Sequence, residues 1–332
     1  MPIIKLTSGI HFKSQRDISI LEAASQAQVL LPYSCKNGRC SACRCKLISG
    51  KTLALQPEIG LSKYEKAEGW ILSCIRSAET DVLLEAENLD GISLPHAKML
   101  PCRISQIQHL APNVIKVNLR LPPAADFYFI PGQYIDVVGP TGVCRSYSLA
   151  NADFKGKVLE LHIRAFEGGA MSQYWFNQAK VNDLLRINGP LGTFFLRNTA
   201  GIDLIFLATG TGIAPIKAML ESITALPSKL QPNSVTILWG GRTLQDLYLD
   251  IICITSNKFT YVPVLSRPTN CWSGSQGYIQ DVLLSIKPNL SKANVYACGS
   301  VQMIHDAKEC LTQAGLSPKH FYSDAFVCSG KN

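Results

Sequence analysis

The chain has 332 residues, of which 47% are hydrophobic and 17% are charged, and its formal net charge is +8. This length and composition predict a folded protein of two or three domains and exclude a disordered or low-complexity chain. The basic residues are dispersed rather than gathered with aromatic residues, so we expect no nucleic-acid binding.

The start of the chain and its cysteines indicate a cytoplasmic protein. Met1-Pro2-Ile3 opens no signal peptide. No stretch approaches the roughly 18 uninterrupted apolar residues of a membrane-spanning helix. There are 12 cysteines, but a chain of this length does not need a disulfide scaffold. We therefore expect free thiols in a reducing compartment.

The first predicted segment covers residues 1–94. Ile3–Phe12 alternates apolar and polar residues around Ser8-Gly9, which predicts a hairpin. Ser19 and Glu22 form a capping-box pattern before a helical stretch that reaches about Gln28. The stretch Asn88–Cys102 contains one glycine and two prolines, and we interpret it as a linker.

Between this helix and the linker lies a cysteine loop, "YSCKNGRCSACRCK". Cys35, Cys40 and Cys43 have the spacing C-x4-C-x2-C, and Cys74 follows in an apolar stretch. This arrangement is typical of plant-type [2Fe-2S] ferredoxins. Gly38 gives the backbone the freedom to bend around a small cluster.

Two alternatives for the cysteines stay open. A zinc site usually uses two close pairs of ligands, whereas Cys74 has no near partner in the sequence. A protein that only binds zinc would be non-catalytic, and an absorbance spectrum would exclude it. Cys45 could replace Cys43 as a ligand, but the spacing favours Cys43, and we interpret Cys45 as a buried spare.

The middle segment, residues 100–199, is predicted to be rich in β-structure. Val114–Leu119, Tyr134–Val138 and Val158–Ile163 are β-branched or alternating runs, separated by proline and glycine. One helix is expected after Met171. Several short strands of this kind predict a small antiparallel barrel.

The last segment, residues 200–332, alternates strands with helices. This order predicts a doubly wound parallel sheet. The expected strands are Asp203–Gly210, Ser234–Gly241, Phe259–Leu265 and Asn294–Gly299, and the clearest helix is Ile213–Ile223.

The whole chain resembles a known family. The stretches "YSCKNGRC", "RSYSLANA", "LHIR", "GPLGTFFLR", "VYACGS" and "FYSDAFV" carry the resemblance. Residues 1–92 resemble a plant-type ferredoxin, and the rest resembles the ferredoxin-NADP reductase superfamily. The order resembles NADH-dependent oxygenase reductases and, more closely, the CDP-6-deoxy-Δ3,4-glucoseen reductases. The resemblance implies a β-grasp ferredoxin domain at 1–94, an FAD-binding barrel at 100–199 and an NAD(P)-binding domain at 200–332.

The motif "RSYS" is the candidate flavin site. Arg145 offers a permanent, fork-shaped charge to a pyrophosphate, Tyr147 can pack on the flavin, and Ser148 can donate towards flavin N5. FAD is expected, with FMN as the alternative because no adenine contact is evident. The resemblance implies further flavin residues: Ser146, His162, Ile163, Arg164, Gly169, Ala170, Met171 and Ser172.

The stretch "LATGTGIAP" is the candidate nicotinamide site. It lies between a predicted strand and helix, and its small residues let the backbone approach a dinucleotide. The resemblance places Cys298 beside the nicotinamide C4 and an acidic residue, Asp324, near the flavin, so Ser148, Cys298 and Asp324 are the candidate catalytic residues. The other implied dinucleotide or flavin contacts are Gly210, Thr211, Gly212, Pro215, Arg242, Ser266, Arg267, Gly299 and Phe326.

The combined motifs predict an electron-transfer reductase. Flavin exchanges both hydride and single electrons, so it belongs between a nicotinamide and a one-electron cluster. NADH is expected rather than NADPH, because "SRP" followed by tryptophan resembles NADH-using members. The acceptor protein implied is a pyridoxamine-phosphate dehydrase of deoxysugar biosynthesis, or else a Rieske or di-iron hydroxylase. The cysteine loop itself carries five basic residues and no acidic one up to Lys51, either as a solvated surface or as a docking rim.

Overall fold

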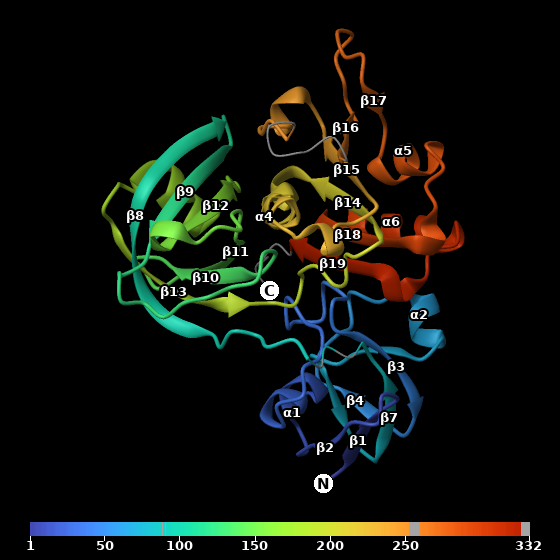
Figure 1. Ribbon diagram of the computed structural model, residues 1–332. Helices are drawn as coiled ribbons and strands as arrows, with labels where there is room; N and C mark the ends of the chain where they lie inside the picture. The colour runs from blue at the N-terminus through green and yellow to red at the C-terminus, as the bar shows by residue number, and fades with distance from the viewer. Residues whose placement is uncertain (88, 90, 252–258, 327–332) are drawn as a thin grey trace. The chain divides into compact units, whose positions relative to one another are not determined.

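The computed structural model describes residues 1–87, 89, 91–251 and 259–326, which form two compact units (Figure 1). The first unit contains Met1–Ser93 with two short segments, Gly192–Phe194 and the chain from Ser323 onward. The second contains Leu94–Leu191 and Phe195–Tyr322. Residues 327–332 lie outside the described residues. No helix in the described ranges is both long and apolar enough to cross a bilayer.

A mixed five-stranded sheet and two short helices make up most of the first unit. Its strands are β1 (Ile3–Leu6), β2 (His11–Lys13), β3 (Arg44–Ser49), β5 (Trp70–Leu72) and β7 (Val82–Glu85), and its helices are α1 (Ile20–Gln26) and α2 (Lys63–Ala67). The sheet order is β2-β1-β7-β3-β5, with β1 parallel to β7. A small second sheet pairs β4 (Thr52–Ala54) with β6 (Arg76–Ala78). This is the expected β-grasp fold.

Local chemistry explains the first elements of this unit. Gly9 turns the β1–β2 hairpin with a φ of 96°, a conformation that glycine adopts at little cost. The hydroxyl of Ser19 accepts a hydrogen bond from the Glu22 N–H at 3.1 Å and begins α1 as predicted. Ile20 and Leu21 of α1 are buried in the same core as the strands, and each of these two side chains contributes about 1.5–3 kcal/mol.

Six antiparallel strands form the expected barrel. The strands are β8 (Lys98–Ala111), β9 (Val114–Arg120), β10 (Tyr134–Val138), β11 (Cys144–Ser148), β12 (Val158–Arg164) and β13 (Leu184–Leu191). Their order is β11-β10-β13-β8-β9-β12. A bridge between Leu149 and Leu161 brings the two outer strands together and closes the barrel. The predicted helix is α3 (Ala170–Gln173), which continues as a π-helical turn through Tyr174–Gln178.

The predicted linker, Asn88–Cys102, is too long at its carboxyl end. Strand β8 already begins at Lys98 and runs through Pro101, which pairs with Arg186 of β13. Proline is tolerated here because the pairing of β8 with its other neighbour, β9, begins only at Arg103.

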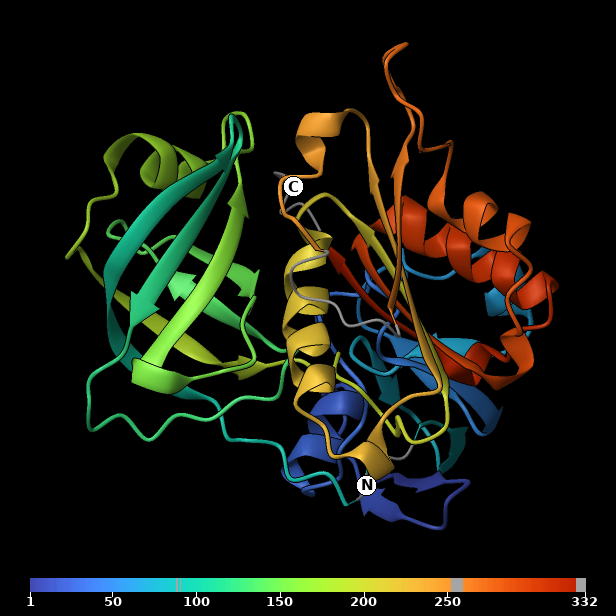
Figure 2. The same ribbon diagram turned by 45° about the horizontal axis from the view of Figure 1, so that its top comes forward.

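The third sheet is the expected doubly wound one. Its strands are β14 (Asp203–Thr209), β15 (Ser234–Gly241), β16 (Phe259–Leu265), β17 (Ser275–Gln276), β18 (Ala293–Ser300) and β19 (Phe321–Phe326), and its helices are α4 (Ile213–Thr224), α5 (Ile279–Ser285) and α6 (Val301–Gln313). The order is β17-β16-β15-β14-β18-β19. Helix α4 covers one face of the sheet, and α5 and α6 cover the other (Figure 2).

A buried polar network joins the barrel to helix α4 within the second unit. Lys217 of α4 donates to Ala150 O at 2.9 Å and to Glu221 Oε1 at 2.6 Å, and its Nζ lies 3.1 Å from Glu160 Oε1 on strand β12. Glu221 in turn accepts from the Ala152 N–H at 2.9 Å. The three protons of the ammonium group therefore have three acceptors, from both the barrel and the helix.

His162 extends this network. Burial lowers the pKa of His162, so the ring is neutral near pH 7. Its Nε2 lies 2.9 Å from Glu160 Oε1, and its Nδ1 lies 3.2 Å from the hydroxyl of Tyr248. Since burial also raises the pKa of Tyr248, this hydroxyl stays protonated and donates to Nδ1, while Nε2–H donates to Glu160.

We predict that acid destabilises the second unit through Glu160. Burial alone would raise its pKa, but the hydrogen bond from His162 and the charge of Lys217 lower the pKa of Glu160 from 4.5 to about 2. Its stabilising contribution, about 3 kcal/mol at most, is therefore complete above pH 4.5 and is lost as the pH falls towards 2. Urea unfolding across this range should show that Glu160→Gln is less stable at neutral pH and lacks this acid dependence. The exposed Glu167→Gln is the control, and wild-type acid dependence in Glu160→Gln would contradict the assignment.

Candidate functional site

The four predicted cluster ligands come together as two pairs within the first unit. Cys35 and Cys40 interact through their side chains, and so do Cys43 and Cys74. The Cys35 N–H also points at Cys40 Sγ, at 3.4 Å. No three His, Cys, Asp or Glu side chains in the described ranges are placed as ligands of one ion. Two thiolates for each of two irons fit this geometry, whereas one zinc ion needs all its ligands around a single point.

Each pair contains one thiol that ionises readily. The hydrogen bond from Cys40 lowers the pKa of Cys35 to about 6 against the opposing effect of burial. A hydrogen bond from Cys43 likewise lowers the pKa of Cys74. Thiolate is the form that binds iron. Cys45 differs, because burial raises its pKa to about 12, as expected for the predicted spare.

The backbone of the ligand loop and a neighbouring segment, residues 57–60, determine the shape of the loop. We call this segment the strap. Lys36, Gly38 and Ser41 all have positive φ, at 54°, 73° and 61°. A Cβ atom on Gly38 would lie 2.7 Å from Ile75 and 3.0 Å from Pro57 O. Only glycine avoids both contacts, and the positive φ of Gly38 is the sharp bend for which the sequence predicts a glycine.

Glu58 anchors this strap beside Cys74. It accepts from Arg76 Nη2 at 2.7 Å and from the Leu72 N–H at 3.1 Å. The next part of the strap reaches the ligand loop, where the Gly60 N–H donates to Gly38 O at 2.8 Å. The strap therefore connects the loop that holds three ligands to the turn that holds the fourth.

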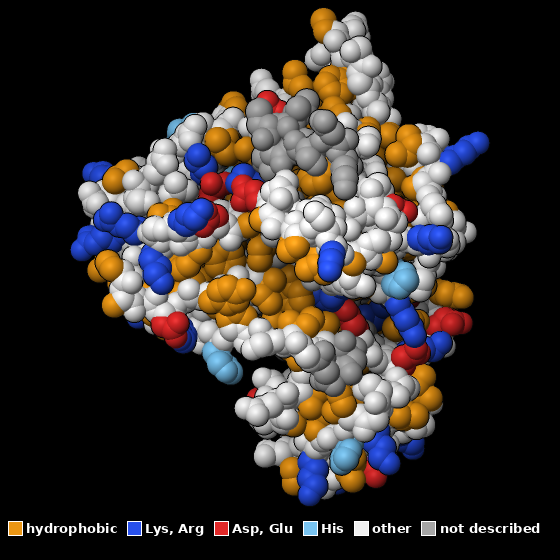
Figure 3. Space-filling model, in the orientation of Figure 1, with side chains coloured by type: hydrophobic (Ala, Val, Ile, Leu, Met, Phe, Trp, Pro, Cys, Tyr) orange, Lys and Arg blue, Asp and Glu red, His pale blue; other side chains and the backbone are white. Residues whose placement is uncertain are grey.

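The basic residues of the loop are partly balanced. Arg44 forms an ion pair with Glu65 at 2.7 Å and stacks over Trp70 at 4.2 Å. Lys36 lies 4.4 Å from the centre of the Tyr33 ring. On the face of the molecule drawn in Figure 3, Lys and Arg side chains are likewise interspersed with Asp and Glu. The charge of Arg44 is therefore balanced within its own unit.

We predict that Cys74→Ala removes the cluster but leaves flavin bound. Alanine is the sharper choice, because serine could still offer an oxygen ligand. Iron content should fall to background, whereas reduction of a dye by NADH should persist. Cys45→Ala is the matched control and should keep its iron. Normal iron in Cys74→Ala would show that Cys74 is not a ligand.

In the barrel, β11 presents Arg145 with its charge uncompensated. Its Nη1 donates to the backbone oxygen of Cys144 at 2.7 Å. No carboxylate in the described part of the chain forms an ion pair with it, so the guanidinium can bind a phosphate. Ser146 differs, because its hydroxyl donates to Asp136 Oδ1 at 2.6 Å.

The next two predicted flavin residues, Tyr147 and Ser148, have fixed positions in the structure. Tyr147 OH accepts from Trp175 Nε1 at 2.9 Å, and burial raises its pKa to about 12. The rings of this pair meet edge to face with centroids 6.1 Å apart. Ser148 is buried at the end of β11. The ring of Tyr147 is therefore fixed in orientation, and its hydroxyl stays protonated, so the side chain can pack on a flavin but does not carry protons.

At two of the predicted flavin positions on β12, His162 and Ile163, only the backbone is free to contact a flavin. The side chain of His162 belongs to the polar network, and that of Ile163 lies in the barrel core. On the edge of β12 away from β9, Leu161 bridges to Leu149 and Glu160 O accepts from the Ala150 N–H at 2.8 Å, and the described residues past Leu161 have no further strand partner there. The N–H and C=O groups beyond this bridge are therefore available to a ligand.

The predicted phosphate loop leads into α3. Gly169 is the N-cap, Ala170 starts the helix and Met171 is buried. Ser172 is engaged locally, since its hydroxyl accepts from the Phe166 N–H at 2.9 Å. The first N–H groups of a helix lack intrahelical partners, and anions bind at such positions.

The predicted nicotinamide residues meet where β14 and β18 end. These strands are parallel neighbours, with Ala208 opposite Cys298. A Cβ atom on Gly212 would lie 2.1 Å from Cys298 O, and one on Gly299 would lie 2.1 Å from Thr209 Oγ1. No side chain fits at either glycine. Dinucleotides bind at such an edge, where the chain connections reverse direction.

Arg164 of β12 reaches this edge. A Cβ atom on Gly210 would lie 3.1 Å from its Nη1, and its Nη2 pairs with Asp246 Oδ1 at 2.5 Å. Its Nε is buried and has no partner in the described residues. A buried donor without an acceptor fits a bound cofactor that completes its hydrogen bonds. Thr211 and Pro215 lie in the turn and helix that follow Gly210.

Two exposed arginines lie together where β15 and β16 end. The Arg267 N–H donates to Arg242 O, and the Ser266 N–H donates to Gly241 O, both at 2.9 Å. The backbones of the two arginines are adjacent, and arginine side chains suit a 2′-phosphate, so NADPH stays the alternative nucleotide.

Asp324 and Phe326 belong to the first unit. Asp324 is buried, and Ser34 Oγ donates to its Oδ1 at 2.5 Å. Burial raises the pKa of Asp324 to about 6, although the hydrogen bond from Ser34 opposes this. Phe326 is half-buried.

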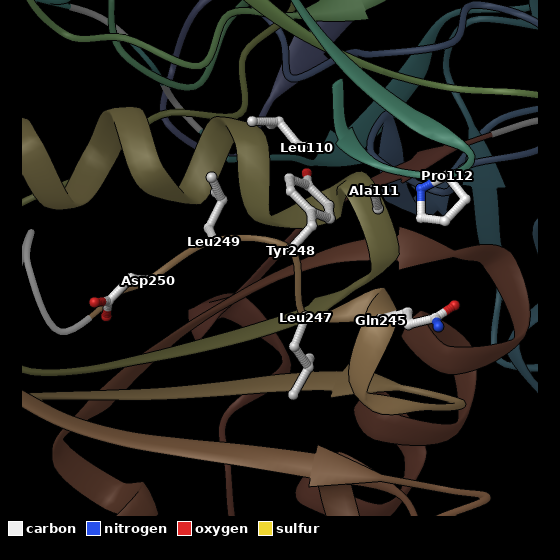
Figure 4. Close-up of a pocket in the computed structure, with 8 residues that line it drawn as sticks. All are labelled: Leu110, Ala111, Pro112, Gln245, Leu247, Tyr248, Leu249 and Asp250. Carbon is white, nitrogen blue, oxygen red and sulfur yellow. The ribbon is translucent and has the colours of Figure 1, made fainter. Parts of the chain in front are cut away.

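A pocket of about 450 Å³ lies between β8 and the segment after β15 (Figure 4). It is lined by Leu110, Ala111, Pro112, Gln245, Leu247, Tyr248, Leu249 and Asp250. None of the predicted cofactor residues is among these eight, so we assign no cofactor to it.

Sequence analysis missed the polar network and the partner of Asp324. Lys217 has a signal in retrospect, because it is a cation in the apolar helix "IAPIKAMLESI". Ser34 directly precedes Cys35, but no local pattern connects it to a residue near the end of the chain.

Comparison with known proteins identifies the family. Three family models match: "2Fe-2S iron-sulfur cluster binding domain" at residues 4–79, "Oxidoreductase FAD-binding domain" at 101–196 and "Oxidoreductase NAD-binding domain" at 206–309. The chain is 39% identical over 325 residues to a CDP-6-deoxy-L-threo-D-glycero-4-hexulose-3-dehydrase reductase of Yersinia pestis, and the match covers 97% of each chain. The chain belongs to this reductase family. It is an NAD(P)H-dependent oxidoreductase with FAD and a [2Fe-2S] cluster, which confirms these predictions over FMN and zinc.

Oxygenase reductases are also relatives of this reductase. The reductase component of a naphthalene 1,2-dioxygenase/salicylate 5-hydroxylase system from Ralstonia sp is 29% identical and covers 99% of the chain and 100% of its own length. The crystal structure of an Amycolatopsis cytochrome P450 reductase is similar with a TM-score of 0.72 and 27% identity, covering 98% of this chain and 99% of that one. These relatives share the modules but differ in the acceptor that their names imply.

Proposed function

We propose that this reductase passes electrons from NADH to a pyridoxamine-phosphate-dependent CDP-4-keto-6-deoxyglucose-3-dehydrase in 3,6-dideoxysugar biosynthesis. The 39% identity to the Yersinia pestis reductase, over 97% of both chains, carries the proposal. The oxygenase reductases, which are the next functional class, reach 30% identity. The higher identity over the full length of both chains therefore favours the dehydrase as the acceptor.

The bound cofactors supply the redox chemistry, in which the two electrons of a hydride are passed on one at a time. The protein binds and orients them. Cys35, Cys40, Cys43 and Cys74 hold the cluster, Arg145 binds the flavin phosphates, and Ser148 lies where it can donate towards the flavin. Gly212 and Gly299 leave room for the nicotinamide beside Cys298, which excludes water from that position. Asp324 has a buried carboxyl group, which accepts a hydrogen bond from Ser34.

A cytoplasmic location is part of the proposal. None of the ten cysteines in the described residues forms a disulfide, in keeping with a reducing compartment.

The deciding experiment compares electron acceptors. The purified reductase is mixed with NADH and either the dehydrase with its CDP-sugar substrate or a Rieske hydroxylase with an aromatic substrate. We expect turnover with the dehydrase, dependent on the cluster and lost in Cys74→Ala. Turnover only with the hydroxylase would assign the protein to the oxygenase systems.

Repeating the assay with NADPH tests which nucleotide the reductase uses. We expect a lower KM for NADH than for NADPH.

We predict that Arg145→Ala and Cys298→Ala affect different steps. Without its guanidinium, Arg145→Ala should bind FAD at least tenfold more weakly, since a charged hydrogen bond contributes about 1.5–3 kcal/mol. Cys298→Ala should keep its FAD but reduce it more slowly, because a gap replaces the buried sulfur. Equilibrium dialysis of FAD and stopped-flow reduction by NADH separate the two effects. An unchanged rate in Cys298→Ala would limit that residue to packing.

A further inference from the structure

The two residues before the first cluster ligand are bound by distant parts of the chain. We call Tyr33–Ser34 the lead segment, since Cys35 follows it directly. The Tyr33 N–H donates to Thr193 Oγ1 at 2.8 Å, and the Thr193 N–H donates to Tyr33 O at 3.0 Å. Both backbone groups of Tyr33 are therefore held by one residue.

Ser34 is held from a third position. Its hydroxyl donates to Asp324 Oδ1 at 2.5 Å. Thr193 and Asp324 are 160 and 290 residues away in the sequence from their partners, yet both belong to the first unit with the cysteine loop. The protein thus uses two segments from outside residues 1–94 to hold the arm of the loop that carries Cys35.

Burial makes these contacts difficult to replace. Ser34, Thr193 and Asp324 are 5%, 3% and 4% exposed, so water cannot substitute for a lost partner. Loss of the Ser34 hydroxyl would leave one carboxylate oxygen with an unmet hydrogen bond, which costs about 1–3 kcal/mol or more for a charged group.

The carboxylate also acts on the cluster by its charge. It lies beside the ligand loop, because Ser34, which donates to its Oδ1, directly precedes Cys35 in the chain. Reduction adds one further negative charge to the cluster, and a buried carboxylate in a medium of low polarity disfavours it. Nearby charge and hydrogen bonding are established controls of the potential of iron–sulfur clusters.

We propose that Asp324, oriented by Ser34, is a positioning residue of the [2Fe-2S] site that lowers the reduction potential of the cluster. This rests on the proposed function, in which Cys35 is a ligand. The family resemblance places an acidic residue here near the flavin, and the hydrogen bond to Ser34 adds a role on the cluster side. A lower potential favours delivery of electrons onward to the acceptor.

The test measures the midpoint potential and the electron paramagnetic resonance spectrum of the reduced cluster at one fixed pH. Asp324→Asn keeps the shape but removes the charge, and we expect a less negative potential. Ser34→Ala keeps the charge but frees the carboxyl group, and we expect a smaller shift with altered g-values. Ser14→Ala is the matched control, because Ser14 is a fully buried serine of the same unit that donates to Gln15 O. It should match the wild type.

Unchanged potentials and spectra in both Asp324→Asn and Ser34→Ala, with full iron content, would overturn the proposal. If Asp324→Asn fails to retain its cluster, Ser34→Ala decides alone, and a wild-type potential and spectrum there overturn it. A wild-type protein without a [2Fe-2S] spectrum would instead refute the proposed function. The two failures are therefore distinguishable.

Discussion

The second unit depends on the contacts that the ammonium group of Lys217 makes with three oxygen acceptors. A charged group can be buried only if its hydrogen bonds are satisfied, and the acceptors of Lys217 come from the barrel and from α4. Correct packing of barrel and nucleotide-binding sheet is therefore a condition for burying this charge. The same packing brings Arg164 of the barrel against Gly210 of the sheet. The flavin and nicotinamide sites thus share one supporting structure.

The cluster site follows a different principle. Its proposed ligands come from one tight loop and one turn, so most of its geometry is local, provided by left-handed backbone positions at residues 36, 38 and 41. Local bending alone does not fix the orientation of the loop. The strap anchored by Glu58 and the contacts of Thr193 and Asp324 hold it from two sides. A redox centre benefits from such rigidity, because rearrangement on reduction slows electron transfer.

Predictions from the sequence succeeded where the signal is periodic or local. The buried strand Asp203–Thr209 and the hairpin around Gly9 follow from hydrophobic pattern and turn chemistry. The linker was overextended because Pro101 normally breaks a strand, and only the pairing of β8 shows that this position needs no donor towards β9. His162 was a predicted flavin residue, but its side chain serves the polar network, which no local pattern reveals.

The sequence by itself determined the kinds of cofactor, which are an iron–sulfur cluster, a flavin and a nicotinamide dinucleotide, and the three kinds of fold. Cysteine spacing, the "RSYS" motif and strand-loop-helix patterns are short-range features, and the chemistry of a ligand loop is written in adjacent residues. Only the tertiary structure decided how the thiols pair, which nitrogen of His162 donates, and that Ser34 meets Asp324. Those contacts join residues up to 290 positions apart. The energies of these contacts depend on the exclusion of water around groups that folding brings together. Local sequence patterns do not predict which distant residues are buried together.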